Sequence, residues 1–157
     1  MASRLSFKIT IMKKLLLSLL FFTIASIQLL AGDGSAENPY TVSEARALAK
    51  STTKIWVQGY IVGGRYDNFE QPWDNDYAVS IADNSGETSI DNCIQIKLEN
   101  SAGHRSLYGL NSNPSAFGMK IKAYGFRDDY GGATFPSIEG ISDANYIVQV
   151  SGEPASV

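Results

Sequence analysis

Two runs of alternating residues, each interrupted by a glycine next to an aromatic residue, constrain the fold of this chain most strongly. They are residues 54–62 (Lys-Ile-Trp-Val-Gln-Gly-Tyr-Ile-Val) and residues 119–126 (Met-Lys-Ile-Lys-Ala-Tyr-Gly-Phe). Alternation with period two is typical of β-strands, and a glycine inside a strand indicates a bulge or a sharp bend. Strands that bend in this way around a small core predict a closed or nearly closed barrel. Small barrels of this kind are binding scaffolds more often than enzymes.

The remaining pattern predicts the order of the elements. Residues 77–83 and 93–99 alternate cleanly, and a last strand is expected near 146–150, with 135–138 as a pairing segment before it. Thr41 and Glu44 have the spacing of a capping box, which predicts a short helix over 42–50. A helical turn near 104–110 separates the third strand from the fourth. We therefore expect an all-β fold with small α content: a five-stranded, OB-fold-like Greek-key barrel with a short N-terminal helix and a short helical insert between strands 3 and 4.

The first 31 residues have the layout of a secretory signal peptide. A basic leader precedes an apolar run, and small residues follow it. Cleavage is expected after Ala31, with Ala25 as the alternative, and Met12 is an alternative start of the protein. The interpretation divides the chain into a signal peptide at 1–31 and a single domain at 32–157. It predicts export to the periplasm or the cell exterior, with no stable membrane span after cleavage.

Charge and composition exclude several classes of site. The leader holds four of the 13 basic residues and none of the 16 acidic ones, so residues 32–157 carry 9 basic and 16 acidic residues, a net charge of −7. A domain that binds polyphosphate without sequence preference normally has a basic surface, which this total does not provide. One cysteine, Cys93, and one histidine, His104, exclude an intramolecular disulfide and any metal site built from cysteines or several histidines. No cofactor or metal is expected.

Several segments resemble one known group of proteins. They are 32–45, 56–63, 81–83, 93–98 and 120–125. Together they are similar to a family of uncharacterised secreted bacterial proteins, whose OB-like domain is similar to one appended to some secreted bacterial nucleases. The resemblance covers roughly residues 32–130 and implies the OB-like fold. It implies no catalytic or binding residues, and the nuclease domain itself is absent from this sequence.

The candidate site lies in the loops that frame the expected barrel. OB barrels bind ligands on the outer face of strands 2 and 3, between the loops after strands 1 and 4. That face would carry Ala78, Ser80, Ala82, Gln95 and Lys97, which include no aromatic residue. The aromatic residues lie in the loops instead, and we select these side chains as ligand-binding: Tyr66, Phe69, Trp73, Lys97, Arg127 and Tyr130.

Each choice has an alternative. Aromatic residues of the 65–76 loop also serve to cap a barrel end, and residues 127–132 also read as a plain glycine-rich hairpin turn. Closely spaced acidic and amide residues at 74–76 and 83–84 suggest calcium, but the twelve-residue ligand spacing of a helix-loop-helix site is missing. No nucleophile, base or carboxylate pair stands out for catalysis.

The sequence therefore predicts an exported, non-catalytic binding module. The nuclease-associated resemblance favours nucleic acid or nucleotide fragments as the ligand. The charge of −7 and the bare strand face favour the alternative, a carbohydrate- or protein-binding domain of the cell surface or periplasm. The expected partners are thus an oligonucleotide, an oligosaccharide or another protein.

Overall fold

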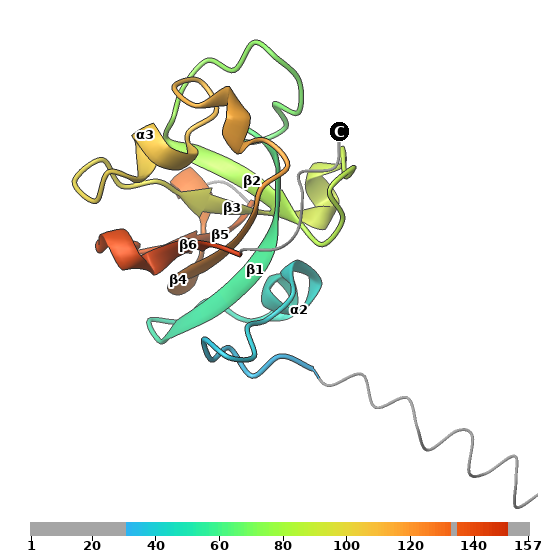
Figure 1. Ribbon diagram of the computed structural model, residues 1–157. Coiled ribbons are helices and arrows are strands. Elements are labelled where there is room, and N and C mark those ends of the chain that lie inside the picture. The colour runs from blue at the N-terminus through green and yellow to red at the C-terminus, as the bar shows by residue number, and fades with distance from the viewer. Residues whose placement is uncertain (1–30, 133–134, 151–157) are drawn as a thin grey trace, which may run out of the picture. The chain divides into compact units, whose positions relative to one another are not determined.

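A computed structural model describes residues 31–132 and 135–150 of the chain (Figure 1). The predicted signal peptide lies outside the described residues, apart from Ala31. Within the described ranges, no helix is long and apolar enough to cross a membrane.

Within residues 31–132 and 135–150, six strands form the fold, and five of them close a barrel. Strand β1 pairs with β2, β2 with β3, β3 with β5, β5 with β4, and β4 again with β1. All of these pairs are antiparallel except β3–β5, which is parallel. This is the connectivity of an OB-fold barrel, so the predicted fold class is confirmed. The strands are β1 (Lys54–Gly63), β2 (Ala78–Ala82), β3 (Cys93–Lys97), β4 (Lys120–Asp129), β5 (Pro136–Glu139) and β6 (Ile147–Gln149).

The fifth barrel strand is the earlier of the two C-terminal candidates. β5 completes the barrel, whereas β6 pairs only with the start of β4, from Ile121 to Ala123. Strand β4 uses one edge for β1 and divides the other between β6 and β5, which takes over at Phe126. The segment expected at 146–150 is therefore an added strand beside the barrel.

Short helical segments connect and cover the strands. Helix α2 (Val42–Ala47) begins with the predicted capping box, in which Thr41 and Glu44 bond each other's backbone N–H groups. It ends before residue 50 because Leu48 is already extended. Helix α3 (His104–Tyr108) is the predicted insert between β3 and β4. The other segments are single 3-10 turns: η1 (Ile90–Asn92), η2 (Pro114–Ala116), η3 (Tyr130–Gly132) and η4 (Ala144–Tyr146).

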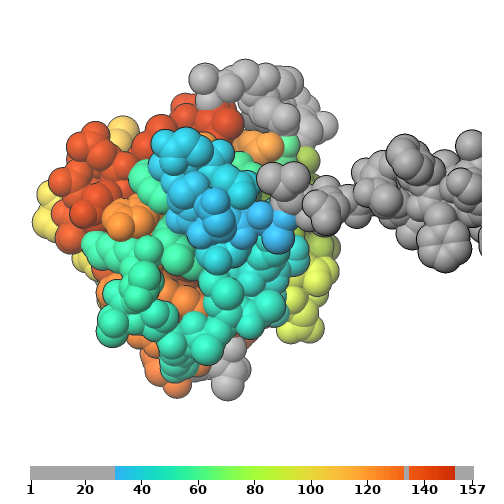
Figure 2. Space-filling view, turned by 90° about the horizontal axis from the view of Figure 1, so that it is seen from below, coloured from blue at the N-terminus to red at the C-terminus, as the bar shows by residue number. Residues whose placement is uncertain are grey.

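The inward-facing strand residues make one core. Alternate positions of β1 to β5 are fully buried, and α2 adds Val42 and Ala45 to the same cluster. Figure 2 looks onto the end of the barrel where the N-terminal segment and α2 lie, in blue and cyan. The largest buried side chains of the core are Ile61, Ile81, Ile94, Ile96, Leu98, Leu110, Ile121, Ile138 and Ile141.

The two glycines inside the predicted strand segments, Gly59 and Gly125, serve close approach, not a bulge. Gly59 and Gly125 both stand in regular β1–β4 register, and the irregularity of β1 lies further on, between Ile61 and Gly63. A Cβ on Gly59 would lie 2.8 Å from the carbonyl oxygen of Ala82. A Cβ on Gly125 would meet the carbonyl oxygen of Glu139. Because these positions lack a side chain, Ala82 of β2 can approach Gly59 and Glu139 of β5 can approach Gly125 closely.

Substitution of Gly125 tests this packing. We expect Gly125→Ala to lower the free energy of unfolding by about 2–3 kcal/mol, because the added methyl group overlaps rigid backbone. Gly86→Ala is the matched control, since nothing lies within 4 Å of a Cβ there. Urea denaturation of both variants measures the difference. Equal stabilities would mean that β4 and β5 separate at little cost.

The thiol of Cys93 provides a second test of the core. Cys93 is buried in a small cluster with Val62 and Ala82, and burial raises the pKa of its thiol to about 12. We expect a thiol reagent at pH 8 to modify the folded protein at least about a hundredfold more slowly than the urea-unfolded chain, since the thiolate is the reactive form. Similar rates in both states would show that this cluster opens readily.

Candidate functional site

The loop between β1 and β2 folds over the outer face of β2 and β3. The hydroxyl of Ser80 lies 3.0 Å from the carbonyl oxygens of Gly64 and of Tyr66. The amide of Gln95 donates to the Ser80 hydroxyl, and its oxygen accepts from the Tyr66 N–H at 2.9 Å. Two buried polar side chains therefore fix the path of the loop.

This loop covers the strand face that the fold predicts as the ligand surface. Ala78, Ser80, Ala82 and Gln95 are buried, while the side chain of Lys97 keeps 41% of its surface exposed. The residues on that face are small because a loop packs directly on them. Of the predicted face, only the end at Lys97 remains open.

A hollow of about 560 Å³ lies at this open end, and we call it the tyrosine cleft. The β1–β2 loop forms one side and the β4–β5 connection another, with the ends of β3 and β5 contributing lining residues. Three of the predicted site residues, Tyr66, Lys97 and Tyr130, line it together. The complete described lining is Lys50, Arg65, Tyr66, Lys97, Asp128, Asp129, Tyr130, Gly131, Gly132 and Glu139.

Aromatic rings form a connected group at this cleft. The Tyr66 ring meets Tyr130 edge-on with 5.5 Å between centroids, and Phe135 at 5.2 Å. The guanidinium of Arg65 lies 4.4 Å from the centre of the Tyr66 ring. Tyr66 is half-buried, whereas Tyr130 is nearly buried, and burial raises the pKa of the Tyr130 hydroxyl. Tyr66 thus offers more ring surface to a ligand than Tyr130 does.

Tyr66 has an unusual backbone conformation. Its φ of +60° is the only positive value among the described non-glycine residues. Such a conformation costs on the order of 1–3 kcal/mol and persists only where surrounding contacts hold it. Here the bonds from Ser80 and Gln95 to the backbone of Tyr66 hold it.

Carboxylates neutralise two lysines of the cleft. Lys97 lies 3.2 Å from Glu139 and 3.9 Å from Glu99. Burial is the largest single influence on the pKa of Lys97 and lowers it, but the hydrogen bond to Glu139 and the charges of Glu139 and Glu99 together leave that pKa raised. Lys50 lies 2.8 Å from Asp129, a hydrogen bond that raises the pKa of Lys50 and lowers that of Asp129.

Arg127 lies beside the cleft and not on its surface. Only 9% of its side chain is exposed, and it donates to Asp129 at 3.1 Å and to the carbonyl of Asp128. Its Nε is buried and has no partner among the described residues. Arg127 therefore holds the carboxylate of Asp129, which in turn meets Lys50.

The other two predicted site residues lie away from the tyrosine cleft. Trp73 is 7% exposed, belongs to the main core and stacks on Phe117 at 5.6 Å. Phe69 packs over Gly63 and the cluster around Cys93. Trp73 and Phe69 thus lie as expected in the alternative given above, in which aromatic residues of the 65–76 loop cap an end of the barrel. Of the six predicted site residues, Tyr66, Lys97 and Tyr130 are the three that the structure brings together in one cleft.

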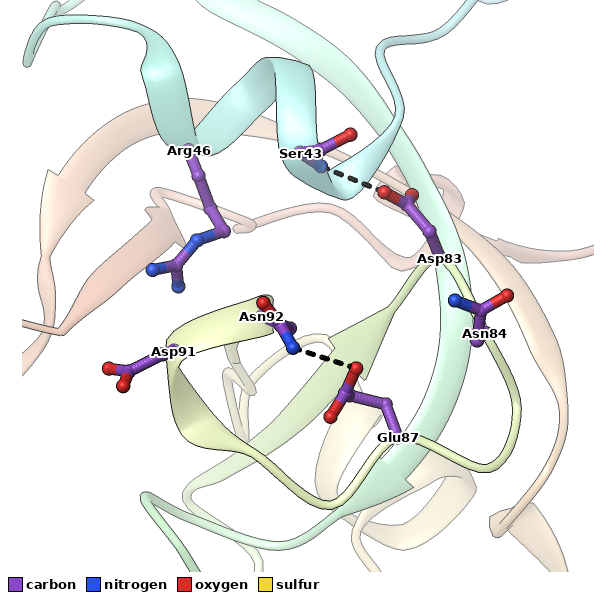
Figure 3. Close-up of a pocket in the computed structure, with 7 residues that line it drawn as sticks. All are labelled: Ser43, Arg46, Asp83, Asn84, Glu87, Asp91 and Asn92. Carbon is purple, nitrogen blue, oxygen red and sulfur yellow. Dashed lines mark hydrogen bonds between the residues drawn. The ribbon is translucent and has the colours of Figure 1, made fainter.

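A second hollow, of about 360 Å³, lies between α2 and the loop that precedes β3 (Figure 3). Asp83 accepts the backbone N–H groups of Val42 and Ser43 at 2.7 and 3.0 Å. Arg46 reaches across from α2 to the carbonyls of Ile90 and Cys93. The hydrogen bonds of Asp83 and Arg46 attach α2 to the barrel, so these side chains of the hollow have a structural role.

Asp76 and Asp83, two of the acidic residues considered for calcium, both accept hydrogen bonds within the protein. Asp76 accepts hydrogen bonds from the backbone N–H and the hydroxyl of Ser112. It does not line the hollow at Asp83. Glu87, which lines the hollow at Asp83, was not among those candidates and accepts the N–H groups of Thr88 and Ser89; the bond from Ser89 is the main cause of its lowered pKa. Across the described part of the chain, no three His, Cys, Asp or Glu side chains are placed to hold a metal ion.

Sequence reasoning missed Lys50, Arg65 and Glu139. Arg65 directly precedes Tyr66, and its position in the same long loop was the available signal. Glu139 reaches Lys97 because β5 runs parallel to β3, a pairing that no local pattern indicates. Lys50 lines the cleft because the neighbouring N–H of Ser51 bonds to the carbonyl of Arg127 on β4.

Comparisons with known proteins give three matches. A family model described as "Domain of unknown function (DUF6359)" matches residues 40–148. Endonuclease YhcR of Bacillus subtilis (strain 168) is 29% identical over 100 residues, which are 61% of this chain and 8% of that protein. The chain thus spans less than a tenth of that relative's length. The solved structure of the hypothetical protein ygiW from E. coli has a TM-score of 0.40 and 16% identity, covering 77% of this chain and 97% of its own.

The structural role of the second hollow can be tested at Asp83. We expect Asp83→Ala to lower the free energy of unfolding by about 1–2 kcal/mol, because two N–H groups at the start of α2 lose their acceptor. Asp91→Ala is the control, since Asp91 is an exposed residue of the same hollow, and it should change stability by less than about 0.5 kcal/mol. Equal losses in urea denaturation would contradict the assigned role of Asp83.

Proposed function

The chain belongs to the DUF6359 family, and from this premise we propose that its barrel is a binding module with the tyrosine cleft as the ligand site. The observation that carries the proposal is the strained backbone of Tyr66, held by Ser80 and Gln95 at the mouth of a hollow. Strain of this kind concentrates at ligand-binding positions, where it keeps a side chain ready for its partner. A fixed ring loses little conformational freedom when a ligand arrives.

The ligand class we favour is a nucleotide or a short single-stranded nucleic acid. A base stacks on the Tyr66 ring, and Arg65 and Lys97 contact the phosphates. Aromatic stacking combined with cations is the usual chemistry of such sites. The similarity to a protein named as an endonuclease supports this choice over 61% of the chain.

A carbohydrate is the second candidate, and the paired charges of the cleft favour it. Lys97 and Lys50 already face Glu139 and Asp129, so a polyanion must compete with these carboxylates. A neutral sugar needs no such competition. Its hydroxyls donate to the carboxylates, and its ring packs on Tyr66.

We also propose that the module acts outside the cytoplasm. This rests on the leader-like pattern of the first 31 residues. Mass spectrometry of the protein purified from a bacterial host with an export pathway tests it, with a new N-terminus after Ala31 or Ala25 as the expected result. Retention of residues 1–31 would contradict it.

Substitution of Tyr66 tests the cleft. We expect Tyr66→Ala to weaken binding of a fluorescein-labelled twelve-nucleotide oligothymidine or oligouridine by about tenfold or more, since one stacked base contributes about 1–3 kcal/mol. Tyr77→Ala is the control, because Tyr77 is an exposed tyrosine that does not line the cleft. Fluorescence anisotropy measures the affinity of each variant.

Salt dependence separates the two ligand classes. Nucleic acid binding should weaken steeply with added salt, and Lys97→Gln should reduce the logarithmic slope by about 0.7. Binding of a neutral glycan should hardly respond to salt and should still be lost in Tyr66→Ala. If Tyr66→Ala changes the affinity for no member of an oligonucleotide and glycan panel, the cleft is not the ligand site.

A further inference from the structure

A second group of aromatic and basic side chains lies on the outer face of β1 and β4, outside the tyrosine cleft. Trp56 of β1 stands directly opposite Tyr124 of β4 in the register of the barrel. Tyr146 of η4, just before β6, joins them from the next segment. We call the set formed by these rings and two lysines the aromatic ladder: Lys54, Trp56, Lys122, Tyr124 and Tyr146.

The rings of the ladder form one continuous surface. Trp56 stacks on Tyr124 with 5.1 Å between centroids and 26° between planes. Tyr124 meets Tyr146 edge-on at 5.0 Å. All three rings are half-buried, although they lie on the outside of a closed barrel. A run of adjoining, partly exposed rings is the kind of platform on which planar groups stack.

Neither lysine of the ladder forms an ion pair with a carboxylate of the described residues. Nζ of Lys54 donates to the carbonyl of Gly140 at 2.8 Å and lies 4.3 Å from the centre of the Tyr146 ring. Nζ of Lys122 donates to the carbonyl of Ala36 at 2.8 Å. The described ion pairs of the chain involve Lys50, Lys97 and Arg127 instead.

This distribution of charge is unusual for the domain. Residues 32–157 carry a net charge of −7, yet neither β1 nor the part of β4 opposite it, from Lys120 to Phe126, contains an acidic residue. The carboxylates of β4 begin only at Asp128, where the strand has left β1 and pairs with β5. The two strands therefore contribute cations and no carboxylates to the ladder.

We propose that the aromatic ladder binds single-stranded nucleic acid, with bases on the rings and phosphates at Lys54 and Lys122. Stacking rings interleaved with cations are the combination that single strands require. An acidic peptide would use the lysines but leave three adjoining rings unexplained. A neutral glycan would use the rings but not the two ammonium groups. The inference concerns a surface separate from the tyrosine cleft and does not depend on ligand binding there.

The two tryptophans of the chain allow a direct test. Trp56 belongs to the ladder, and Trp73 is buried in the core, so Trp73→Phe leaves Trp56 as the only indole fluorophore. We expect titration of this variant with a twelve-nucleotide oligothymidine or oligouridine to quench the Trp56 emission. Comparison of the two titrations distinguishes DNA from RNA as the preferred strand. Inorganic polyphosphate, which has no bases, should produce little quenching.

Charge variants locate the binding surface. In the Trp73→Phe background, Lys54→Gln together with Lys122→Gln should weaken oligonucleotide binding about tenfold or more and reduce the logarithmic salt slope by about 1.4. Arg105→Gln is the matched control, since it removes one cation from α3 that belongs neither to the ladder nor to the cleft lining, and it should leave Trp56 quenching unchanged. Lys122→Gln alone serves if the loss of the Lys54–Gly140 bond unfolds the double variant.

Three results would overturn the proposal. They are unchanged Trp56 emission at oligonucleotide concentrations up to millimolar, equal quenching by polyphosphate, and an affinity insensitive to both ladder lysines in a folded variant. If Tyr66→Ala loses affinity in the anisotropy assay while oligonucleotide still quenches Trp56 normally, the result supports the tyrosine cleft as a site and leaves the ladder proposal standing. The failures of the two proposals are thus distinguishable.

Discussion

The pairing of β1 with β4 is the constraint on which the rest of this structure depends. It closes the sheet on itself over seven residue pairs, from Lys54–Phe126 to Tyr60–Lys120. Closure brings the inward faces of five short strands around one core without a disulfide. It also requires neighbouring segments to press close at Gly59 and Gly125, where a side chain would collide with backbone. The same pairing sets Trp56 against Tyr124 on the outer face.

A second interaction determines how much of the outer face of β2 and β3 stays exposed. The side chains of Ser80 and Gln95 bond to the backbone of the β1–β2 loop and hold it over β2 and β3. The loop thereby covers the broad strand face and leaves a cleft at its edge, between Tyr66 and the β4–β5 connection. The two surfaces proposed for binding therefore lie in the cleft at the edge of the β2–β3 face and on the outer face of β1 and β4.

The fold could be predicted from the sequence because its signals are local. Alternation predicted the strand ends to within three residues, and the Thr41–Glu44 spacing predicted the start of α2. Strand β5 was harder, since only four residues form it and its parallel pairing with β3 joins residues about forty positions apart. Local patterns carry no information on such a pairing.

The candidate site was predicted only in part, for a different physical reason. Tyr66, Phe69 and Trp73 belong to one loop of similar composition, and nothing in the residue types separates an exposed ring from a buried one. The structure separates them through the path of the loop, which places Trp73 against Phe117 and Tyr66 at the cleft. The positive φ of Tyr66 and its bonds to Gln95 arise from long-range contacts. Sequence periodicity does not report such contacts.

Residues just outside the range of the family model, 40–148, should be kept in a recombinant fragment of this domain. The family model spans residues 40–148, but Gly34 accepts the N–H of Trp56, and Val150 donates its N–H to Lys120. A fragment trimmed to the matched range would lose both contacts and uncover backbone groups along β1 and β4. Bare strand edges of that kind invite strand addition between molecules. A crystallisation fragment is therefore better begun at Gly32 and continued past Val150.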